Sequence, residues 1–315
     1  MLKDELLEVL ENNRGSFVNG TKFAQKFFVS KNAVSKAAKA LCDEGYPIIS
    51  TPNKGYTLVG NILSAQGIKK YLNNVFFDVI LFNSVDSTNN EVKKQAREGA
   101  KEGLTIAARQ QTSGKGRRNR TFFSPVDSGV YFSILVRPDI DLNKSLYLTT
   151  LSAVAVCNAI EKIFGISTQI KWVNDIYYKN KKVCGILTEG ETDIENNKLN
   201  FAVVGIGINV NRPFNGFPQE IRETATNLDE DCLEETNNKL VAAVLNNFYA
   251  YYKNIADKTF LEEYRQKSLL TGKTVKVSDG RIAFVEEIDD EFNLIVNYSD
   301  KTRGILNSGE VSVKL

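Results

Sequence analysis

The spacing of apolar residues divides the chain into three regions. Up to about residue 60, apolar residues recur at helical spacing and are followed by two short alternating runs. From about residue 65 to 268, apolar runs of strand length alternate with long apolar helical stretches. From residue 269 onward, nearly all apolar residues lie in short alternating runs. We therefore expect three domains, at residues 1–64, 65–268 and 269–315.

The first region predicts a winged helix-turn-helix. Apolar residues near the N-terminus predict one helix, and Thr21 and Ser30 are placed to cap a second and a third helix. Ile48–Thr51 and Gly55–Leu58, joined by a Pro-Asn-Lys turn, predict a β-hairpin wing. The order of helix, turn, capped helix and wing is that of a DNA-binding module.

The charge of this region supports the same interpretation. Five lysines and no acid lie between Asn19 and Cys42. A solvated lysine face on a small helical domain would explain the charge alone, but the whole pattern favours DNA binding. The residues expected to enter the major groove lie at the exposed start of the third helix: Lys31, Asn32, Ser35 and Lys36.

The other two regions predict different architectures. Strand-like runs such as Leu104–Ala108 and Val130–Val136, with long helices over Ser145–Phe164 and Asn237–Ile255, indicate a mixed α/β domain around one sheet. The short alternating strands after residue 269 fit a barrel of five or six strands. We therefore expect a multidomain α+β protein.

Composition excludes several kinds of chemistry. The chain has no histidine, so it holds no Ser-His-Asp or Cys-His centre and no His-ligated zinc. Cys42, Cys157, Cys184 and Cys232 are scattered without a CxxC pair, as expected of reduced thiols in the cytoplasm. The acidic N-terminus lacks a signal-peptide core, and no apolar run approaches the length of a membrane span.

The segment most indicative of chemistry is a basic loop. No acid occurs from Leu104 to Val126, and residues 111–120 read QTSGKGRRNR. Two glycines allow the backbone to approach a ligand, and the cations with free N–H groups favour a phosphate or carboxylate. The alternatives are a flexible basic surface loop or a nucleic-acid contact. The loop does not match the Walker pattern.

Four further segments accompany this loop: SVDSTN at residues 84–89, KWVND at 171–175, KVCGIL at 182–187 and GIGIN at 205–209. Each alone has an ordinary structural explanation, such as an Asx turn or glycines that make room for packing. In this order, and with FFSP at residues 122–125, they resemble the biotin protein ligases. The first region, VSKNAVSKAAKAL with the wing NKGY, is similar to the bifunctional members that also repress biotin-synthesis operons. The C-terminal SGEV at residues 308–311 fits too, so the resemblance covers essentially the whole chain.

The resemblance implies a winged helix, a central ligase domain related to class II synthetases and a C-terminal SH3-like barrel. It implies that biotin and MgATP form biotinoyl-5′-AMP, which then acylates one lysine of a biotin carboxyl carrier protein. Operator DNA is the second implied partner, and a homodimer is expected when the adenylate is bound.

The resemblance also assigns roles to residues. Lys182, Arg117 and Lys171 are the catalytic candidates, and Asp175 is a candidate Mg²⁺ ligand. The residues assigned to biotin are Ser87, Thr88, Asn89, Gln111, Lys115, Gly116, Arg117, Lys182, Gly205 and Gly207. Those assigned to the nucleotide are Arg117, Arg118, Arg120, Asn174, Asp175 and Asn209.

Four positions depart from the family pattern. Lys115 replaces the first arginine of the loop and keeps its charge without the planar fork. Asn119 replaces a glycine, Val173 a proline and Phe122 a tryptophan. None of these changes removes a group that the chemistry requires.

Two other functions remain open on the sequence. A lipoate ligase shares the central fold, but that family normally lacks the winged helix and this type of loop. A transcription factor could retain the ligase domain only as a sensor, but the intact Lys182, Arg117 and Asn209 argue against that.

Overall fold

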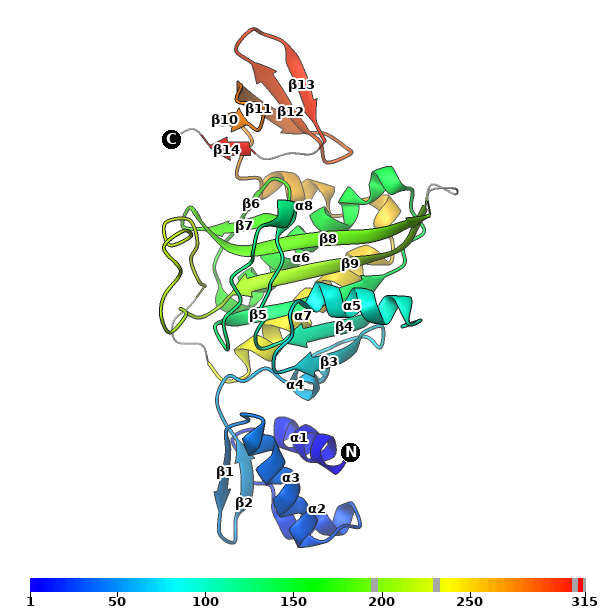
Figure 1. Cartoon of the computed structure of the whole chain (residues 1–315), viewed down its shortest axis with the longest axis vertical. Helices are drawn as coiled ribbons and strands as arrows, with labels where there is room; N and C mark the ends of the chain where they lie inside the picture. The colour runs from blue at the N-terminus through cyan, green and yellow to red at the C-terminus, as the bar shows by residue number, and fades with distance from the viewer. Residues whose placement is uncertain (194–197, 229–232, 308–310, 314–315) are drawn as a thin grey trace.

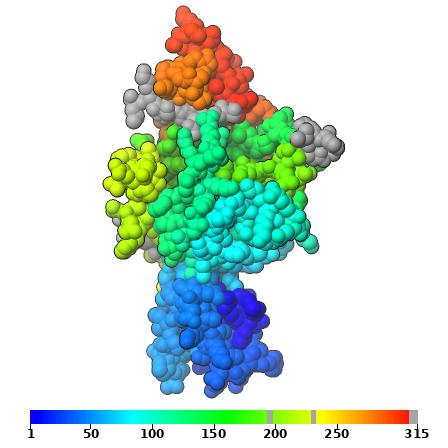
Figure 2. Space-filling view, viewed as in Figure 1, coloured from blue at the N-terminus to red at the C-terminus, as the bar shows by residue number. Residues whose placement is uncertain are grey.

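The computed structural model describes residues 1–193, 198–228, 233–307 and 311–313. Three lobes follow one another along the long axis of the molecule, with the winged helix at one end and the C-terminal sheet at the other (Figure 1). The space-filling view shows the N-terminal lobe set off from the central lobe by a narrowing (Figure 2). The central lobe holds the five sequence motifs.

The N-terminal lobe is a winged helix with its own apolar core, which includes Leu6, Leu41 and Leu58. Its elements are α1 (Leu2–Asn12), α2 (Gly20–Lys26), α3 (Lys31–Asp43), β1 (Ile48–Thr51) and β2 (Gly55–Leu58). β1 and β2 pair antiparallel and form the wing. The expected helix-turn-helix and wing are thus confirmed.

The caps of its helices follow ordinary side-chain chemistry. The Ser30 hydroxyl accepts a hydrogen bond of 3.1 Å from the Ala33 N–H, as expected for the start of α3. The expectation that Thr21 caps α2 is wrong. Asn19 is the cap, because its side-chain oxygen accepts from the N–H groups of both Thr21 and Lys22.

The central lobe is built on a seven-stranded sheet in the order β3-β4-β5-β9-β8-β7-β6. Only β3 and β4 run parallel, and every other neighbouring pair is antiparallel. The strands are β3 (Asp78–Phe82), β4 (Leu104–Ala108), β5 (Gly129–Val136), β6 (Gln169–Lys171), β7 (Asp175–Tyr178), β8 (Lys181–Asp193) and β9 (Lys198–Asn209).

Helices cover both faces of this sheet. The long helices α6 (Leu146–Phe164) and α7 (Thr236–Tyr252) pack together on one face, and α5 (Thr88–Arg97) packs on the other, against β4, β5 and β9 (Figure 1). The short helices α4 (Ala65–Lys70) and α8 (Leu261–Gln266) contact α7 and α6, respectively. The segment Leu142–Phe164 is long and apolar enough to cross a membrane by composition. However, 72% of its apolar window is buried inside the protein, as in a core helix.

The C-terminal lobe is a five-stranded antiparallel sheet in the order β13-β12-β11-β10-β14. In the part of the chain that the structure describes, β13 and β14 are the edges of this sheet and do not pair with each other, so the expected closed barrel is not found. Ser308 to Glu310 lie outside the described residues. The strands are β10 (Thr274–Val277), β11 (Ile282–Ile288), β12 (Leu294–Tyr298), β13 (Arg303–Leu306) and β14 (Val311–Val313).

An aromatic contact joins this sheet to the central lobe. The Phe292 ring stacks on Phe260 at 5.2 Å between centroids and meets Tyr264 edge-on at 5.5 Å. The indole N–H of Trp172 donates to the Phe292 carbonyl at 2.9 Å. The single tryptophan of the chain therefore anchors the 171–175 segment to the third lobe.

Two polar contacts join the winged helix to the central lobe. In the first, the buried guanidinium of Arg109 lies 4.4 Å from the centre of the Tyr46 ring. It donates to the carbonyls of Glu44, at 2.9 Å, and Leu63, at 3.4 Å. Arg109 directly follows β4, so this contact ties the end of α3 to the central sheet.

The second contact is a charged network between α1, α4 and the start of α7. Arg14 binds Glu11 through a 2.6 Å ion pair and donates to the Gly60 carbonyl at 2.6 Å. Lys70 pairs with Glu235 at 2.7 Å and donates to the Glu11 carbonyl at 2.8 Å. The two lobes are therefore held together by hydrogen bonds and ion pairs, in addition to the polypeptide that links them.

Candidate active site

The basic loop lies beside the segment before α5. β3 and β4 run parallel, and their continuation pairs Val85 with Gln111. The N–H groups of Thr112 and Ser113 donate to the carbonyls of Val85, at 2.9 Å, and Asp86, at 2.8 Å. Two motifs that are more than twenty residues apart in the sequence therefore form one wall.

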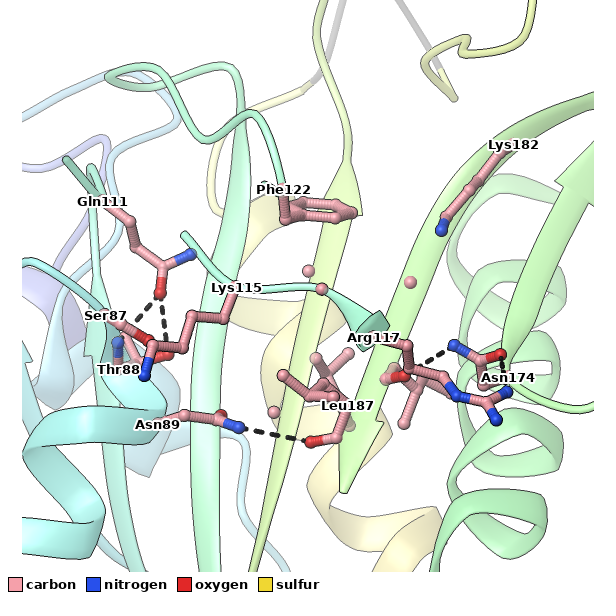
Figure 3. Close-up of a pocket in the computed structure, with 16 residues that line it drawn as sticks. Ser87, Thr88, Asn89, Gln111, Lys115, Arg117, Phe122, Asn174, Lys182 and Leu187 are labelled. Carbon is pink, nitrogen blue, oxygen red and sulfur yellow. Dashed lines mark hydrogen bonds between the residues drawn. The ribbon is translucent and has the colours of Figure 1, made fainter. Parts of the chain in front are cut away.

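A pocket opens between this wall and strands β8 and β9 (Figure 3). All ten residues expected to bind biotin line it, as does Asn174 from the predicted nucleotide set. The other lining residues have no ligand contact predicted from the sequence: Phe122, Gly185, Ile186, Leu187 and Ile206.

One end of the pocket is a network of uncharged polar side chains. The Gln111 side-chain oxygen accepts from the Thr88 backbone N–H at 2.8 Å and from the Thr88 hydroxyl at 3.1 Å. The Gln111 amide nitrogen donates to the Ser124 hydroxyl at 2.9 Å. Ser87 makes no side-chain hydrogen bond among the described residues, so its hydroxyl proton is available to a ligand.

The other end of the pocket carries Lys182 and Arg117, whereas Lys115 lies at the polar end and donates to Asn90 Oδ1 at 2.7 Å (Figure 3). Lys182 Nζ lies 2.7 Å from Asp175 Oδ1, and Arg117 Nη1 donates to Asn174 Oδ1 at 3.0 Å. Asn174 is held in turn because its Nδ2 donates to the Ile186 carbonyl at 2.8 Å. Figure 3 shows Lys182 and Arg117 on the side of the pocket opposite Gln111 and Thr88.

Glycines and one aromatic ring shape the space between the two ends. A Cβ atom at Gly207 would lie 2.4 Å from the Phe122 ring, and a Cβ at Gly205 would lie 2.0 Å from Asn89 Oδ1. The Phe122 ring meets Tyr131 edge-on at 6.4 Å. Phe122 thus supplies an aromatic wall where the family pattern has a tryptophan, and the two glycines leave room for Phe122 and Asn89.

The loop itself uses the left-handed backbone region. Arg118 and Asn119 have φ values of 55° and 61°. Asparagine is among the residues that tolerate this region best, so Asn119 can replace the family's usual glycine. The turn is closed by the Gly116 N–H, which donates to the Arg120 carbonyl at 2.7 Å.

Several predicted residues lie outside the pocket lining. Lys171 stacks over the Tyr177 ring at 5.3 Å, and Asn209 donates to the Thr226 carbonyl at 3.1 Å. Arg118 and Arg120 are exposed on the loop, and Asp175 reaches the pocket only through Lys182. The structure therefore brings the biotin set together and leaves part of the nucleotide set beside it.

A second, open hollow lies next to this pocket along residues 212–227. The backbone of Lys182 connects the two, because its N–H donates to the Thr224 carbonyl at 2.8 Å and its carbonyl accepts from the Thr226 N–H at 2.9 Å. The 212–227 segment was not identified from the sequence, which shows there no glycine-rich or basic pattern of the kind seen in the loop.

The described residues include no group of three His, Cys, Asp or Glu side chains that could hold a metal ion. Burial raises the pKa of the Cys184 thiol well above its ordinary value, so Cys184 is neutral and a poor nucleophile. Cys42, Cys157 and Cys184 are free thiols, and Cys232 lies outside the described residues.

Comparison with known proteins gives consistent matches. The biotin/lipoate A/B protein ligase family matches residues 81–209, and an HTH domain matches residues 3–57. The bifunctional ligase/repressor BirA of Bacillus subtilis is 36% identical over 238 residues, which are 73% of this chain and 71% of that protein. Its counterpart in Escherichia coli is 30% identical over 65% of this chain and 63% of that protein.

A solved structure agrees with these matches. The biotin protein ligase from Aquifex aeolicus in complex with biotin and ATP is 27% identical and superimposes with a TM-score of 0.61. The match covers 75% of this chain and 98% of that one.

Proposed function

This chain belongs to the biotin/lipoate A/B protein ligase family, among its bifunctional ligase/repressors, and from that premise we propose how its pocket works. The pocket binds biotin and ATP, joins them as biotinoyl-5′-AMP and passes the biotinoyl group to a lysine of a biotin carboxyl carrier protein. The winged helix binds operator DNA and represses transcription. The domain bounds of 1–64, 65–268 and 269–315, and an SH3-like closure of the last domain, remain part of this proposal.

The observation that carries the choice of biotin is the polar end of the pocket. Thr88 and Asn89 present oxygen atoms there, and Ser87 has a hydroxyl proton to donate. The ureido ring of biotin brings two N–H donors and one carbonyl acceptor, which complement these groups. The dithiolane ring of lipoate has no such groups, so it would give the Ser87 hydroxyl no acceptor and would bring no N–H donor to the remaining lone pairs of Thr88 and Asn89.

The cationic end of the pocket suits the first reaction step. A biotin carboxylate oxygen attacks the α-phosphorus of ATP, a phosphorus–oxygen bond forms, and pyrophosphate leaves. Lys182 and Arg117 flank the place where these two anions meet, so they lower the repulsion between them and stabilise the charge that gathers. Asp175 holds Lys182 in place through its ion pair.

In the second step a carrier lysine amine attacks the acyl carbon. An amide bond forms, AMP leaves and the amine loses its proton. No covalent enzyme intermediate is required, which agrees with the absence of histidine and with the neutral Cys184.

Mg²⁺ enters as part of MgATP. Mg²⁺ is commonly held by one or two carboxylates with substrate phosphates supplying further oxygens. Asp175 is the carboxylate paired with the cationic end of the pocket, and Lys182 occupies one of its oxygens at 2.7 Å. Asp175 remains the candidate ligand through its other oxygen.

Purified protein tests the ligase proposal through biotin-dependent ATP–pyrophosphate exchange. We expect exchange with biotin and none above background with lipoate. Exchange with lipoate alone would establish the lipoate function instead, and no exchange with either acid would favour a sensor that binds without catalysis.

The exposed polar and basic side chains of the winged helix support the repressor function. Lys31, Asn32, Ser35 and Lys36 are all exposed on α3, on the side opposite the buried Val34 and Ala37. One winged helix makes few phosphate contacts, so we propose that adenylate binding promotes a homodimer that reaches two half-sites. We propose that this work takes place in the cytoplasm, where ATP, DNA and reduced cysteines occur together.

A further inference from the structure

Behind the pocket wall lies a second layer of polar residues that the reaction does not use. Ser133, on β5, is fully buried; its hydroxyl donates to Asn89 Oδ1 at 2.6 Å and lies 2.7 Å from the Thr88 hydroxyl. Glu189, on β8, accepts from Asn89 Nδ2 at 2.8 Å. These residues touch the biotin-facing side chains but do not line the pocket.

The orientation of the Asn89 amide follows from these contacts. Its Nδ2 faces the Glu189 carboxylate and, at 3.3 Å, the Leu187 carbonyl, which can only accept hydrogen bonds. Both N–H groups of this amide are therefore used inside the protein. The Asn89 oxygen then faces Ser133, which must donate to it, and its remaining lone pair is the only group that Asn89 can offer a ligand.

Thr88 is set in the same way. The one proton of Ser133 goes to Asn89, so the Thr88 hydroxyl proton points to Ser133 Oγ, at 2.7 Å, or to Gln111 Oε1, at 3.1 Å, and either acceptor belongs to the protein. Thr88 and Asn89 consequently both present acceptors to the pocket. Figure 3 shows the Asn89 nitrogen directed at the Leu187 carbonyl.

Glu189 stays ionised in this setting. Partial burial alone would raise the pKa of Glu189, but hydrogen bonds from Lys93 and Asn89 outweigh it and lower the pKa below its ordinary value. Lys93 Nζ lies 2.8 Å from Glu189 Oε1, which leaves Oε2 for Asn89.

From this geometry we infer that Ser133 and Glu189 are positioning residues that set the hydrogen-bond polarity of the biotin pocket. They force Thr88 and Asn89 to act as acceptors, so the pocket selects a ligand with N–H donors. The inference rests on the proposed function and adds to it the residues that determine which way the amide points.

Glu189→Gln is the sharpest test. Lys93 requires an acceptor, so the new amide turns its oxygen toward Lys93 and its NH₂ group toward Asn89. Two NH₂ groups would then face each other, and Asn89 relieves the conflict by turning over. The pocket then presents a donor where biotin also brings one. We expect the KM for biotin to rise about tenfold or more, with kcat changed less than about threefold, because one ground-state contact is lost.

The matched control is Glu191→Gln, the same chemical change two residues along β8. Glu191 is exposed and pairs with Arg97 at 3.1 Å, away from the pocket. Its KM for biotin should stay within about twofold of the wild type. An equal rise in KM in both variants would overturn the inference, because a general effect on β8 would then explain the result.

Two further measurements separate positioning from a structural effect. In an Asn89→Ala background, Glu189→Gln should have no further effect on the KM for biotin, because both changes act through one amide. Wild-type protein should discriminate strongly between biotin and an analogue methylated on one ureido nitrogen, and Glu189→Gln should reduce that ratio. The ratio of biotin to desthiobiotin, which keeps both N–H groups, should not move.

The outcomes keep this inference apart from the proposed function. Wild-type exchange with biotin together with an unchanged KM in Glu189→Gln would overturn the inference and leave the ligase standing. Wild-type protein that does not use biotin would overturn the proposed function and the inference with it.

Discussion

Lys182 is the side chain on which the proposed adenylation depends most. Its ammonium group lies at the cationic end of the pocket and is held 2.7 Å from Asp175. Removing one such preorganised group typically costs about 3–4 kcal/mol of transition-state stabilisation. Lys182→Ala should therefore lose biotin-dependent pyrophosphate exchange by a factor of about 100 to 1,000 while its thermal unfolding stays unchanged.

Lys181→Ala is the control for this change. Lys181 is the neighbouring residue, and its side chain points to Glu223 at 3.9 Å instead of the pocket. Its exchange rate should match that of the wild type. If Lys182→Ala exchanged pyrophosphate within a few-fold of the wild type, another cation would have to carry the step.

Gly205 is required by the close approach of a side chain. A methyl group there would lie 2.0 Å from Asn89 Oδ1, and Asn89 would have to leave its place. Gly205→Ala should weaken biotin binding at least about tenfold, measured by calorimetry, and cost about 1–3 kcal/mol of stability.

Gly190→Ala is the matched control, because its added methyl group meets the end of the flexible Leu199 side chain at 2.9 Å and the Phe201 carbonyl at an ordinary 3.4 Å. Unchanged biotin affinity in Gly205→Ala would mean that Asn89 does not contact the ligand.

At this scale the sequence predicts the pocket lining well and the layer behind it poorly. The residues that line the pocket stand in polar or glycine-rich motifs that interrupt apolar runs, so they can be recognised. Ser133 lies inside the apolar run of β5 and has an ordinary appearance in the sequence. Only the three-dimensional structure reveals its role. Ser133 pairs with Gly205 of β9, and in that position its hydroxyl contacts Asn89.

Among the elements, α3 carries the proposed contact with DNA. Lys31→Ala combined with Lys36→Ala removes two exposed cations from its N-terminal face. Each phosphate contact contributes about 0.9 to the slope of log affinity against log salt, so the slope should fall by up to about 2. Operator binding, measured by fluorescence anisotropy, should weaken strongly, and pyrophosphate exchange should be unaffected because it occurs in another lobe.

A control with the same change of charge is Lys253→Ala combined with Lys276→Ala. Both lysines are exposed, and they lie in the central and C-terminal lobes. Equal loss of binding in this control would indicate a general charge effect and not recognition by α3.

The sequence predicts helices and strands better than it predicts which residue caps a helix or which strands pair at the edge of a sheet. Apolar spacing correctly indicates β4, β5, α6 and most of α7 in the central lobe, because burial of one face sets that spacing, but it does not indicate the helices α4, α5 and α8. The cap of α2 was misplaced since Asn19 and Thr21 are both good caps by residue type. The local sequence pattern also cannot predict whether the last sheet closes into a barrel, because closure depends on pairing between two edge strands that are distant in the sequence.

In the whole molecule, the contact between the winged helix and the central lobe includes a titratable group, the carboxylate of Glu235. Partial burial alone would raise the pKa of Glu235, but hydrogen bonds from Lys70 and Tyr71 outweigh it and lower the pKa below the ordinary value of 4.5. A carboxyl with a lowered pKa stabilises the folded protein above its unfolded pKa. That contribution is lost as the pH falls through the folded pKa.

Glu235→Gln should therefore lower the melting temperature at neutral pH. The difference from the wild type should shrink progressively below about pH 4.5, measured by calorimetry across that range. Glu262→Gln, which changes an exposed carboxylate on α8, serves as the control. A difference that stayed constant with pH would show that the Glu235 charge does not support the joint.

These joints were not apparent in the sequence. Arg109 belongs to the basic segment whose charge suggests an anion site, yet its guanidinium is buried against Tyr46 and Glu44 of the first lobe. The sequence shows the charge of a residue but not its partner. It therefore does not distinguish an arginine that binds a ligand from one that connects two lobes, whereas the three-dimensional contacts do.

The Arg109 and Lys70 contacts also have a consequence for the geometry of the operator. A winged helix on a loose tether could follow its half-site around the double helix, but here it is held at two points and cannot turn freely. In the proposed dimer, the two recognition helices would then face one side of the DNA in a fixed rotational phase. Inserting about five base pairs between the half-sites turns one of them to the opposite side, whereas inserting about ten restores the phase. Anisotropy titrations should therefore show affinity lost at the half-turn insertion and largely regained at the full turn, and equal affinity at every spacing would show that the lobes move independently.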